Sequence, residues 1–236
     1  MRLMNAWINP LAFLDVDGPP APNLPGQPTP QTVLGFICPP GTSADVGTLV
    51  GRYKEISSEP VALAVVPAEQ RILDKLVWPL RHAKALYMVG NYLAVIALAG
   101  MVAEMVALLR WEVSEISLNG RPMTADAEKA LCGTTFERLG QERRLQVLWA
   151  YGLIDAAARG RFDTIKETRR GYLHLWSQDH DSLPRDAIKS YHAAVALVAT
   201  TIGQEFREGK IVINQPLVTY LERQGVYQPR EEPSAV

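Results

Sequence analysis

Cysteine is scarce in this chain of 236 residues, which has only two, Cys38 and Cys132. Two cysteines give neither a disulfide framework nor a metal-binding set, so a reducing compartment is expected. The N-terminus also lacks the unbroken apolar core of a signal peptide, because Asn5, Asn9 and Pro10 interrupt it. Together these absences predict a cytoplasmic protein.

An excess of charge is missing as well. The 24 Lys and Arg residues nearly balance the 25 Asp and Glu residues, which leaves a formal net charge of −1 and a pI near 6.4. This balance argues against a broadly basic nucleic-acid binder but leaves room for a local basic site. The sequence shows no Cys/His cluster and no paired-carboxylate motif for a metal ion, so we expect no metal and no other cofactor.

The hydrophobic content of 47% is typical of a folded soluble protein. Residues 1–66 are expected to form an N-terminal arm and a small cap. Residues 17–30 are dense in Pro and Gly, which disfavour helices and central strands. The apolar runs at 32–38 and 61–66 have the length and the β-branched residues of strands. The cap is therefore predicted as irregular or two-stranded, with a short helix or a loop at 47–57.

Residues 67–236 are predicted to form an antiparallel helical bundle with a C-terminal extension, so the fold class is mainly α. Apolar residues first recur at helical spacing up to residue 89, with a kink rather than an end expected at Pro79. The stretch 92–103 is then uninterruptedly apolar, and its pattern continues to residue 109. A helix that is apolar all round is contacted from most sides, so this segment is predicted as the central core helix.

A membrane-associated helical protein built on residues 92–109 is the alternative interpretation of the same stretch. A spanning helix needs roughly 20 apolar residues, and Glu104 interrupts the run. A charged residue near the centre of a span costs about 2.5–3.5 kcal/mol on insertion scales. We therefore favour a core helix with no membrane as partner. A buried Glu104 needs a cation, which Arg110 or an arginine from another helix would supply.

The middle of the chain contains two local signals. Residues 119–122, Asn-Gly-Arg-Pro, are a strong turn signal, and the polar segment up to Gly133 is expected to be a loop with one short helical turn. Residues 134–137, Thr-Thr-Phe-Glu, have the pattern of a capping box. They predict a helix that runs to about Ile154.

Three further boundaries are predicted in the last third of the chain. Residues 156–160 are small and are expected to form a turn before a helix that opens at Phe162. Ser182 is expected to cap the next helix, with Gly209 as its stop. A short helix is expected from Pro216, because proline is favoured in the first helical turn.

An arginine and a histidine lie five residues apart within 167–174, Glu-Thr-Arg-Arg-Gly-Tyr-Leu-His. This Arg169-to-His174 spacing resembles the signature of the HEPN superfamily, an arginine followed after four to six residues by a histidine. The resemblance extends over roughly residues 68–208. It includes a Tyr-x-x-Gly-Asn-Tyr step at 87–92, an Ala-rich second helix and a third helix that ends in Tyr-Gly-Leu-Ile.

The resemblance implies a small α-helical domain that is often dimeric and in many members is a metal-independent ribonuclease. It implies Arg169 and His174 as catalytic residues, RNA as substrate, and a toxin or defence setting with an antitoxin or other protein partner. Arg170 stands where active members often have Asn, Asp or His. A non-catalytic HEPN-like protein for dimerisation or interaction is therefore kept as the alternative function.

The chemistry of the two residues fits the cleavage of RNA. Histidine titrates near neutrality and can take a proton from a ribose 2′-hydroxyl, and arginine can hold a phosphate through two N–H groups. Residues five apart on a regular α-helix are about 140° apart. Either Gly171 disturbs the helix, or the pair acts in a cleft shared with a second chain of a homodimer.

Basic residues gather around the motif and suggest where RNA would bind. Between positions 137 and 170 they outnumber the acidic ones, and Lys166 and Arg170 are the candidates for RNA contacts. Any one of them also fits an ordinary charged helix face, paired for example with Asp163 or Glu167. The basic residues of this stretch are Arg138, Arg143, Arg144, Arg159, Arg161, Lys166, Arg169 and Arg170.

Overall fold

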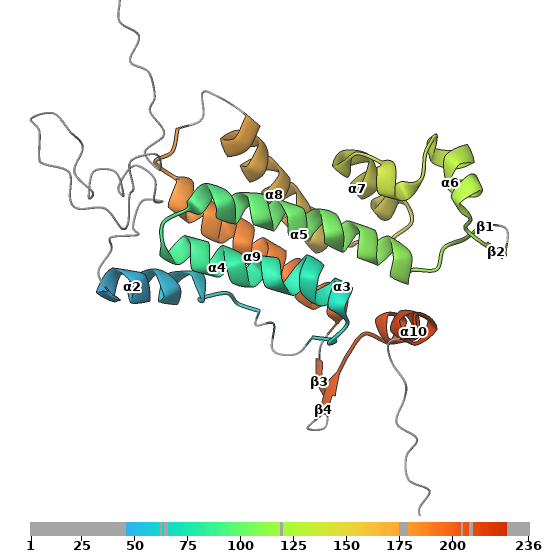
Figure 1. Cartoon of the computed structure of the whole chain (residues 1–236). Helices are drawn as coiled ribbons and strands as arrows, with labels where there is room; N and C mark the ends of the chain where they lie inside the picture. Colours follow the sequence, from blue (N-terminus) through green and yellow to red (C-terminus); the bar gives the residue numbers. More distant parts are fainter. Residues whose placement is uncertain are drawn as a thin grey trace, which may run out of the picture.

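The computed structural model confirms a mainly α protein, an antiparallel helical bundle (Figure 1). It describes residues 46–61, 63, 66–118, 120–174, 179–203, 205–207 and 210–225, with the backbone alone for 118, 174, 205–207 and 210–212. The helices are α2 (Val46–Ile56), α3 (Gln70–Ile72), the π-helical η2 (Leu73–Val77), α4 (Trp78–Met88), α5 (Tyr92–Val113), α6 (Ala125–Cys132), the 3₁₀ turn η3 (Phe136–Arg138), α7 (Gln141–Ala150), α8 (Ala156–His174), α9 (Leu183–Ile202) and α10 (Gln215–Arg223). Two short antiparallel hairpins complete them, β1 (Ser117–Leu118) with β2 (Arg121–Pro122) and β3 (Glu205–Arg207) with β4 (Lys210–Val212).

Helix α5 is the centre of the bundle, as its composition predicts. It packs against α9, α4 and α8 along its length, and these helices lie side by side around it in Figure 1. Its side chains Val95, Ile96, Val102 and Val106 are fully buried. Each such buried aliphatic side chain contributes about 1.5–3 kcal/mol of burial free energy, so α5 anchors the core.

The same helix is long and apolar enough to cross a membrane by length and composition. It is the one helix with this property among the described residues. The core helix of a soluble protein satisfies the same criteria, so a single example is weak evidence. In the structure α4, α8 and α9 pack on this helix, and 44% of its most apolar stretch is buried inside the chain.

Helix α2 occupies the position where the sequence left a choice between helix and loop. It packs against α4 and α9, and Ile56 is fully buried in the common core. The predicted strand at 61–66 is wrong for the part that the structure describes, since 61, 63 and 66 lie in no strand. Leu63 and Val66 instead pack against the core as single side chains. The other predicted strand, 32–38, lies outside the described residues.

Pro79 does not end the helix, as predicted. The helix starts after Glu69, whose carboxylate oxygen accepts the amide of Ile72 at 2.9 Å. Immediately before the proline the chain widens into the π-helical turn η2, in which the amide of Trp78 donates to the carbonyl of Leu73. A proline removes one backbone donor and crowds the preceding turn, and a π-turn at this place accommodates both effects.

The predicted capping box at 134–137 is wrong. The amide of Phe136 donates to the carboxylate of Glu128 at 2.9 Å, and the Thr135 side chain makes no capping hydrogen bond. Only a 3₁₀ turn forms there, and α7 begins at Gln141 after an extended break. Glu128 lies in α6, a helix of 8 residues that Thr124 caps, where a loop with one helical turn was predicted. A distant carboxylate thus outcompetes the local cap.

Two more predicted boundaries are moved by capping groups. Residues 156–160 form the first turn of α8, because Asp155 accepts the amide of Ala158 through its side chain at 2.7 Å. Helix α9 ends before Gly203 and not at Gly209. Gly203 has the left-handed backbone conformation, with φ 64°. A Cβ at Gly203 would lie 2.6 Å from the Asn214 Cβ, so only glycine fits this corner. The predicted helix at Pro216 is confirmed as α10.

Candidate functional site

Arg169 lies on the side of α8 that faces α5 and forms an ion pair there with Glu104. The two residues are 65 positions apart in the sequence, and the contact joins the motif helix to the central helix. The Arg169 side chain is 37% exposed and that of Glu104 32% exposed. The carboxylate therefore orients the guanidinium without removing it from solvent. An arginine from another helix partners Glu104, one of the two arrangements that the sequence left open.

Gly100 makes this arrangement possible. It lies one turn before Glu104 on α5, and the aliphatic part of Arg169 crosses over it. A Cβ at this position would lie 2.7 Å from the Arg169 Cδ, closer than side-chain atoms approach without displacement. The missing side chain of Gly100 therefore leaves a groove on α5 in which the arginine side chain lies.

A pocket of about 230 Å³ opens between α5, α7 and α8 beside this ion pair. Arg169 and Arg170 lie on its lining together with Lys166. Gln141, the first residue of α7, lines it too, and its buried side-chain oxygen has no hydrogen-bond partner among the described residues. The lining residues are Gly100, Ala103, Glu104, Gln141, Phe162, Ile165, Lys166, Arg169 and Arg170. The pocket thus offers three cationic side chains and one amide.

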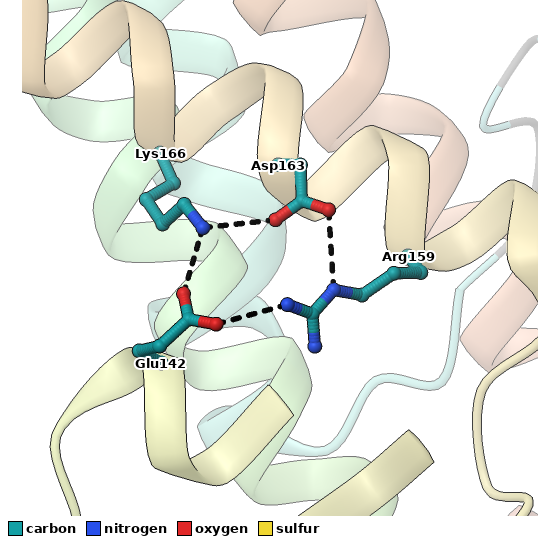
Figure 2. Close-up of polar contacts among 4 residues, drawn as sticks. All are labelled: Glu142, Arg159, Asp163 and Lys166. Atoms are coloured by element: carbon teal, nitrogen blue, oxygen red, sulfur yellow. Dashed lines mark hydrogen bonds and ion pairs between the residues drawn. The ribbon is translucent and has the colours of Figure 1, made fainter. Parts of the chain in front are cut away.

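Four charged residues form a closed network at one side of the pocket, and Figure 2 shows them facing one another across α7 and α8. Glu142 accepts hydrogen bonds from Lys166 at 2.7 Å and from Arg159 at 3.0 Å. Asp163 accepts from the same two cations, at 3.0 Å and 3.1 Å. Lys166, a candidate RNA contact, is therefore already bound to two carboxylates that fix α7 to α8.

The network shifts the ionisation of its own members. The hydrogen bond from Lys166 holds the pKa of Glu142 below its ordinary value, with a smaller contribution from Arg159. Burial alone would raise the pKa of Asp163, but the hydrogen bonds from Lys166 and Arg159 outweigh it and lower that pKa. The same contacts, led by Glu142, raise the pKa of Lys166. All four groups thus stay charged near neutral pH.

Arg170, the second candidate RNA contact, differs from its neighbours. Its side chain is exposed at the pocket and forms no ion pair within the part of the chain that the structure describes. It is therefore the cation at this pocket whose charge is most open to a ligand.

His174 is the last residue of α8, which continues as an α-helix through Gly171. Gly171 therefore does not disturb the helix. On a regular helix His174 is about 140° from Arg169 but only about 40° from Arg170, one turn before it. The end of α8 is fixed by Tyr172, whose hydroxyl donates to Asp186 of α9 at 2.8 Å. Burial and this carboxylate raise the pKa of Tyr172 to about 12.

Sequence reasoning identified the cations of this site but missed the groups that position them. Gly100 lies unmarked within the apolar stretch 92–103, and Glu142 and Gln141 lie inside a helix expected to start earlier. Glu142 carries no signal of its own in the sequence. The one available signal was the unpaired acid on an apolar helix, Glu104.

The arrangement can bind an anion more readily than a metal ion. Arg169 has N–H groups left beyond its contact with Glu104, and guanidinium groups bind phosphate through paired N–H donors. Within the described ranges no group of three or more His, Cys, Asp or Glu side chains is placed to hold a metal ion.

Comparisons of the chain with protein-family models, with curated proteins and with solved structures find no match.

Proposed function

We propose that this protein acts on RNA through the pocket between α5, α7 and α8, as a HEPN-like metal-independent endoribonuclease. The observation that carries the proposal is the orientation of Arg169. Glu104 and Gly100 hold its guanidinium at the edge of a pocket that Arg170 also lines. Two adjacent arginines at one opening suit a phosphodiester, which accepts paired N–H donors.

The unpaired amide oxygen of Gln141 favours RNA over DNA as the ligand. It is buried at the pocket and has no hydrogen-bond partner among the described residues. A buried acceptor without a donor costs about 1–3 kcal/mol, and a ribose 2′-hydroxyl would remove that cost. Since the 2′-hydroxyl is the group that distinguishes RNA from DNA, Gln141 would contribute to that selection.

In the proposed reaction His174 transfers the proton. Its imidazole takes the proton of the 2′-hydroxyl, and the 2′-oxygen attacks the adjacent phosphorus. The bond from phosphorus to the 5′-oxygen breaks, and the imidazolium returns the proton to the leaving 5′-oxygen. The products are a 2′,3′-cyclic phosphate and a free 5′-hydroxyl. Arg170, one helical turn before His174, holds the same phosphate, and Arg169 stabilises the charge that develops on it.

A homodimer is part of the proposal. On the outer side of α5, next to Gly100 and Glu104, Ala97 is exposed and Met101 is 38% exposed. A second copy packed there about a two-fold axis would bring two pockets together and exclude water from both.

The test is a cleavage and binding assay on single-stranded RNA with EDTA present throughout. Arg169→Ala and His174→Ala should each abolish cleavage, and loss of the proton transfer alone is worth about 10²–10⁴-fold. Arg170→Ala should mainly weaken binding and flatten its salt dependence. A substrate with 2′-deoxyribose at the cut should resist cleavage.

Arg81→Ala is the matched control, because Arg81 is an exposed arginine on α4, away from the pocket. Its cleavage rate should equal that of the unaltered protein. Cleavage that survives His174→Ala, or that requires magnesium, would contradict the mechanism. Light scattering that returns a monomer at micromolar concentration would contradict the shared cleft.

A second candidate function is favoured by the carboxylates around the pocket. Lys166 and Arg159 are each bound to two acids and Arg169 to one, so their charges serve the packing of α7 and α5 on α8. The corresponding proposal is a non-catalytic dimerisation or interaction protein, paired with a protein partner. A dimer that neither binds nor cuts RNA at low salt would select this function over the first.

A further inference from the structure

A second arginine, Arg110, lies at the opposite end of α5 from the turn at Gly90, and three neutral oxygens hold it. Its Nε donates to the hydroxyl of Thr201 at 2.9 Å and one Nη to the hydroxyl of Thr200 at 3.1 Å. The other Nη donates to the carbonyl of Leu153 at 3.1 Å. Three of the five guanidinium N–H groups are thus used, and two remain.

Arg110 has no carboxylate at ion-pair distance within the described part of the chain, which sets it apart from Arg159 and Arg169. Burial lowers its pKa, a nearby Asp155 counteracts this in part, and Arg161 adds to the lowering. A partly buried cation without a carboxylate at ion-pair distance is unfavourable, because neutral oxygens replace only part of its hydration. An anion bound beside it would offset that cost.

A pocket of about 510 Å³ opens beside Arg110, between the ends of α5 and α9 and the start of α10. Its volume lies within the range of small-molecule sites, roughly 300–1,000 Å³. Besides Arg110, the lining includes the polar residues Ser114, Asn214 and Gln215. The one acidic residue that lines it, Glu115, is paired with Arg223.

The start of α10 provides a second, independent feature of the same pocket. Asn214 occupies the N-cap position, but its side chain makes no capping hydrogen bond, and the first turn contains no acidic residue. The first amides of a helix have no partners within it and attract anions. The first amides of α10 are therefore without a side-chain cap, and Gln215 lies on the lining of the pocket, while Pro216 beside it supplies no amide.

We propose that this pocket binds the phosphoryl group of a small phosphorylated compound. The two remaining N–H groups of Arg110 approach the phosphoryl oxygens from α5, and the uncapped amides of α10 approach them from the other side. Convergent donors from a guanidinium and a helix N-terminus match a tetrahedral dianion. The site is separate from the pocket at Arg169, so it does not depend on activity toward RNA.

The experiment measures thermal unfolding of the full chain with increasing inorganic phosphate and, in a second series, adenosine monophosphate. Sodium chloride at matched ionic strength is the reference. At a concentration about five times the dissociation constant, the midpoint should rise by about 2–4 °C. A larger rise in the midpoint with the nucleotide than with phosphate would identify a phosphate monoester as the ligand. An equal rise would identify free phosphate.

Two variants make the test specific. Arg110→Gln should weaken phosphate binding by at least about tenfold, since it removes a charge-assisted hydrogen bond. Because that change also affects folding, Asn214→Asp is the second variant. Its carboxylate caps α10 and should raise the midpoint without phosphate, while it repels phosphate and should abolish the response. Arg81→Gln, at an exposed position on α4, should respond like the unaltered protein.

Two results would overturn the proposal. One is an unaltered protein that gains no more from phosphate than from sodium chloride at millimolar concentration. The other is an Asn214→Asp variant that is stabilised by phosphate as strongly as the unaltered protein.

Discussion

Arg169 and Arg110 both lie at the central helix α5, but their side chains have different kinds of hydrogen-bond partners. The pocket around each arginine differs accordingly. Arg169 reaches α5 from α8 and finds a carboxylate, Glu104, while its half-exposed guanidinium stays hydrated. Arg110 leaves α5 toward α9 and finds only hydroxyl and carbonyl oxygens. In the first region the arginine has a carboxylate partner, and in the second it has none at ion-pair distance among the described residues.

The contrast teaches where each cation contributes. A cation that is paired and partly exposed adds little to stability, because water solvates both partners nearly as well in the unfolded chain. A cation with several neutral partners matters more to its surroundings, since its removal takes the donor from each of the oxygens that it binds. Function and stability are therefore expected to depend on different arginines.

The largest effect is predicted for the comparison of Arg110→Ala with Arg169→Ala in urea unfolding at neutral pH. The first change removes three hydrogen bonds and leaves a cavity, which should lower the unfolding free energy by about 2–4 kcal/mol. The second removes one half-exposed ion pair and should cost about 1 kcal/mol or less. Losses of equal size would refute the proposed division between the two regions.

A smaller effect is predicted for the carboxylate network in acid. The pKa values of Glu142 and Asp163 are lowered in the folded protein, so the unfolded chain binds protons first as the pH falls. The stabilisation is complete above the ordinary range, about pH 4.3 for glutamate, and is lost as the pH falls through the lowered pKa values. Because Glu142 is half-exposed, the whole contribution should stay below about 1 kcal/mol.

Urea unfolding between about pH 6 and pH 3 measures this contribution. Glu142→Gln should reduce the slope of stability against pH in that window. Glu137→Gln is its matched control, since Glu137 is exposed just before α7 and no side-chain contact of it is described. An unchanged slope in Glu142→Gln would show that the network adds nothing to the attachment of α7 to α8.

The helical body and its centre were predictable because they depend on periodicity. The run at 92–109 is apolar on nearly every face. A helix of this kind needs neighbours on most sides, whatever its local capping residues are. The break at Gly90-Asn91 was equally visible, since Asn91 caps α5 by accepting the amide of Ala94. Burial of apolar area decides these features, and the sequence expresses it directly.

Two of the boundaries that failed each depend on a single competing hydrogen bond. The Thr134-to-Glu137 residues match the pattern of a capping box, but the cap does not form. The carboxylate of Glu128, in α6, accepts the Phe136 amide instead. The small residues after Asp155 suggest a turn, but they begin a helix because the aspartate side chain caps it. Differences of about 1 kcal/mol between alternative caps decide such boundaries, and a distant partner is not visible locally.

The candidate site was half predictable for the same reason. The cations Lys166, Arg169 and Arg170 stand out in the sequence by type and spacing. Their partners Glu142 and Gly100 do not, because they come from other helices and depend on the packing of α5 and α7 against α8. The spacing from Arg170 to His174, one helical turn, became apparent only when α8 proved continuous through Gly171.

The smallest stability effect, and the sharpest separation of stability from function, is predicted for Gly100→Ala. The added Cβ would lie 2.7 Å from the Arg169 Cδ, so the arginine side chain must shift, and we expect it to lose its contact with Glu104. Loss of that ion pair costs up to about 1 kcal/mol, while alanine in place of glycine inside a helix gains about 1 kcal/mol. The two terms nearly cancel, so the unfolding free energy should hardly change. RNA binding should nevertheless fall as far as in Arg169→Ala.

Gly160→Ala is the control for the helical gain alone. Gly160 lies in α8 itself, and a Cβ there meets no atom within 4 Å. This variant should be more stable than the unaltered protein by about 1 kcal/mol and should bind RNA unchanged. If Gly100→Ala shows the same gain and keeps RNA binding while Arg169→Ala loses it, the arginine does not need the groove over Gly100. Its orientation by Glu104 would then not be what prepares it for phosphate.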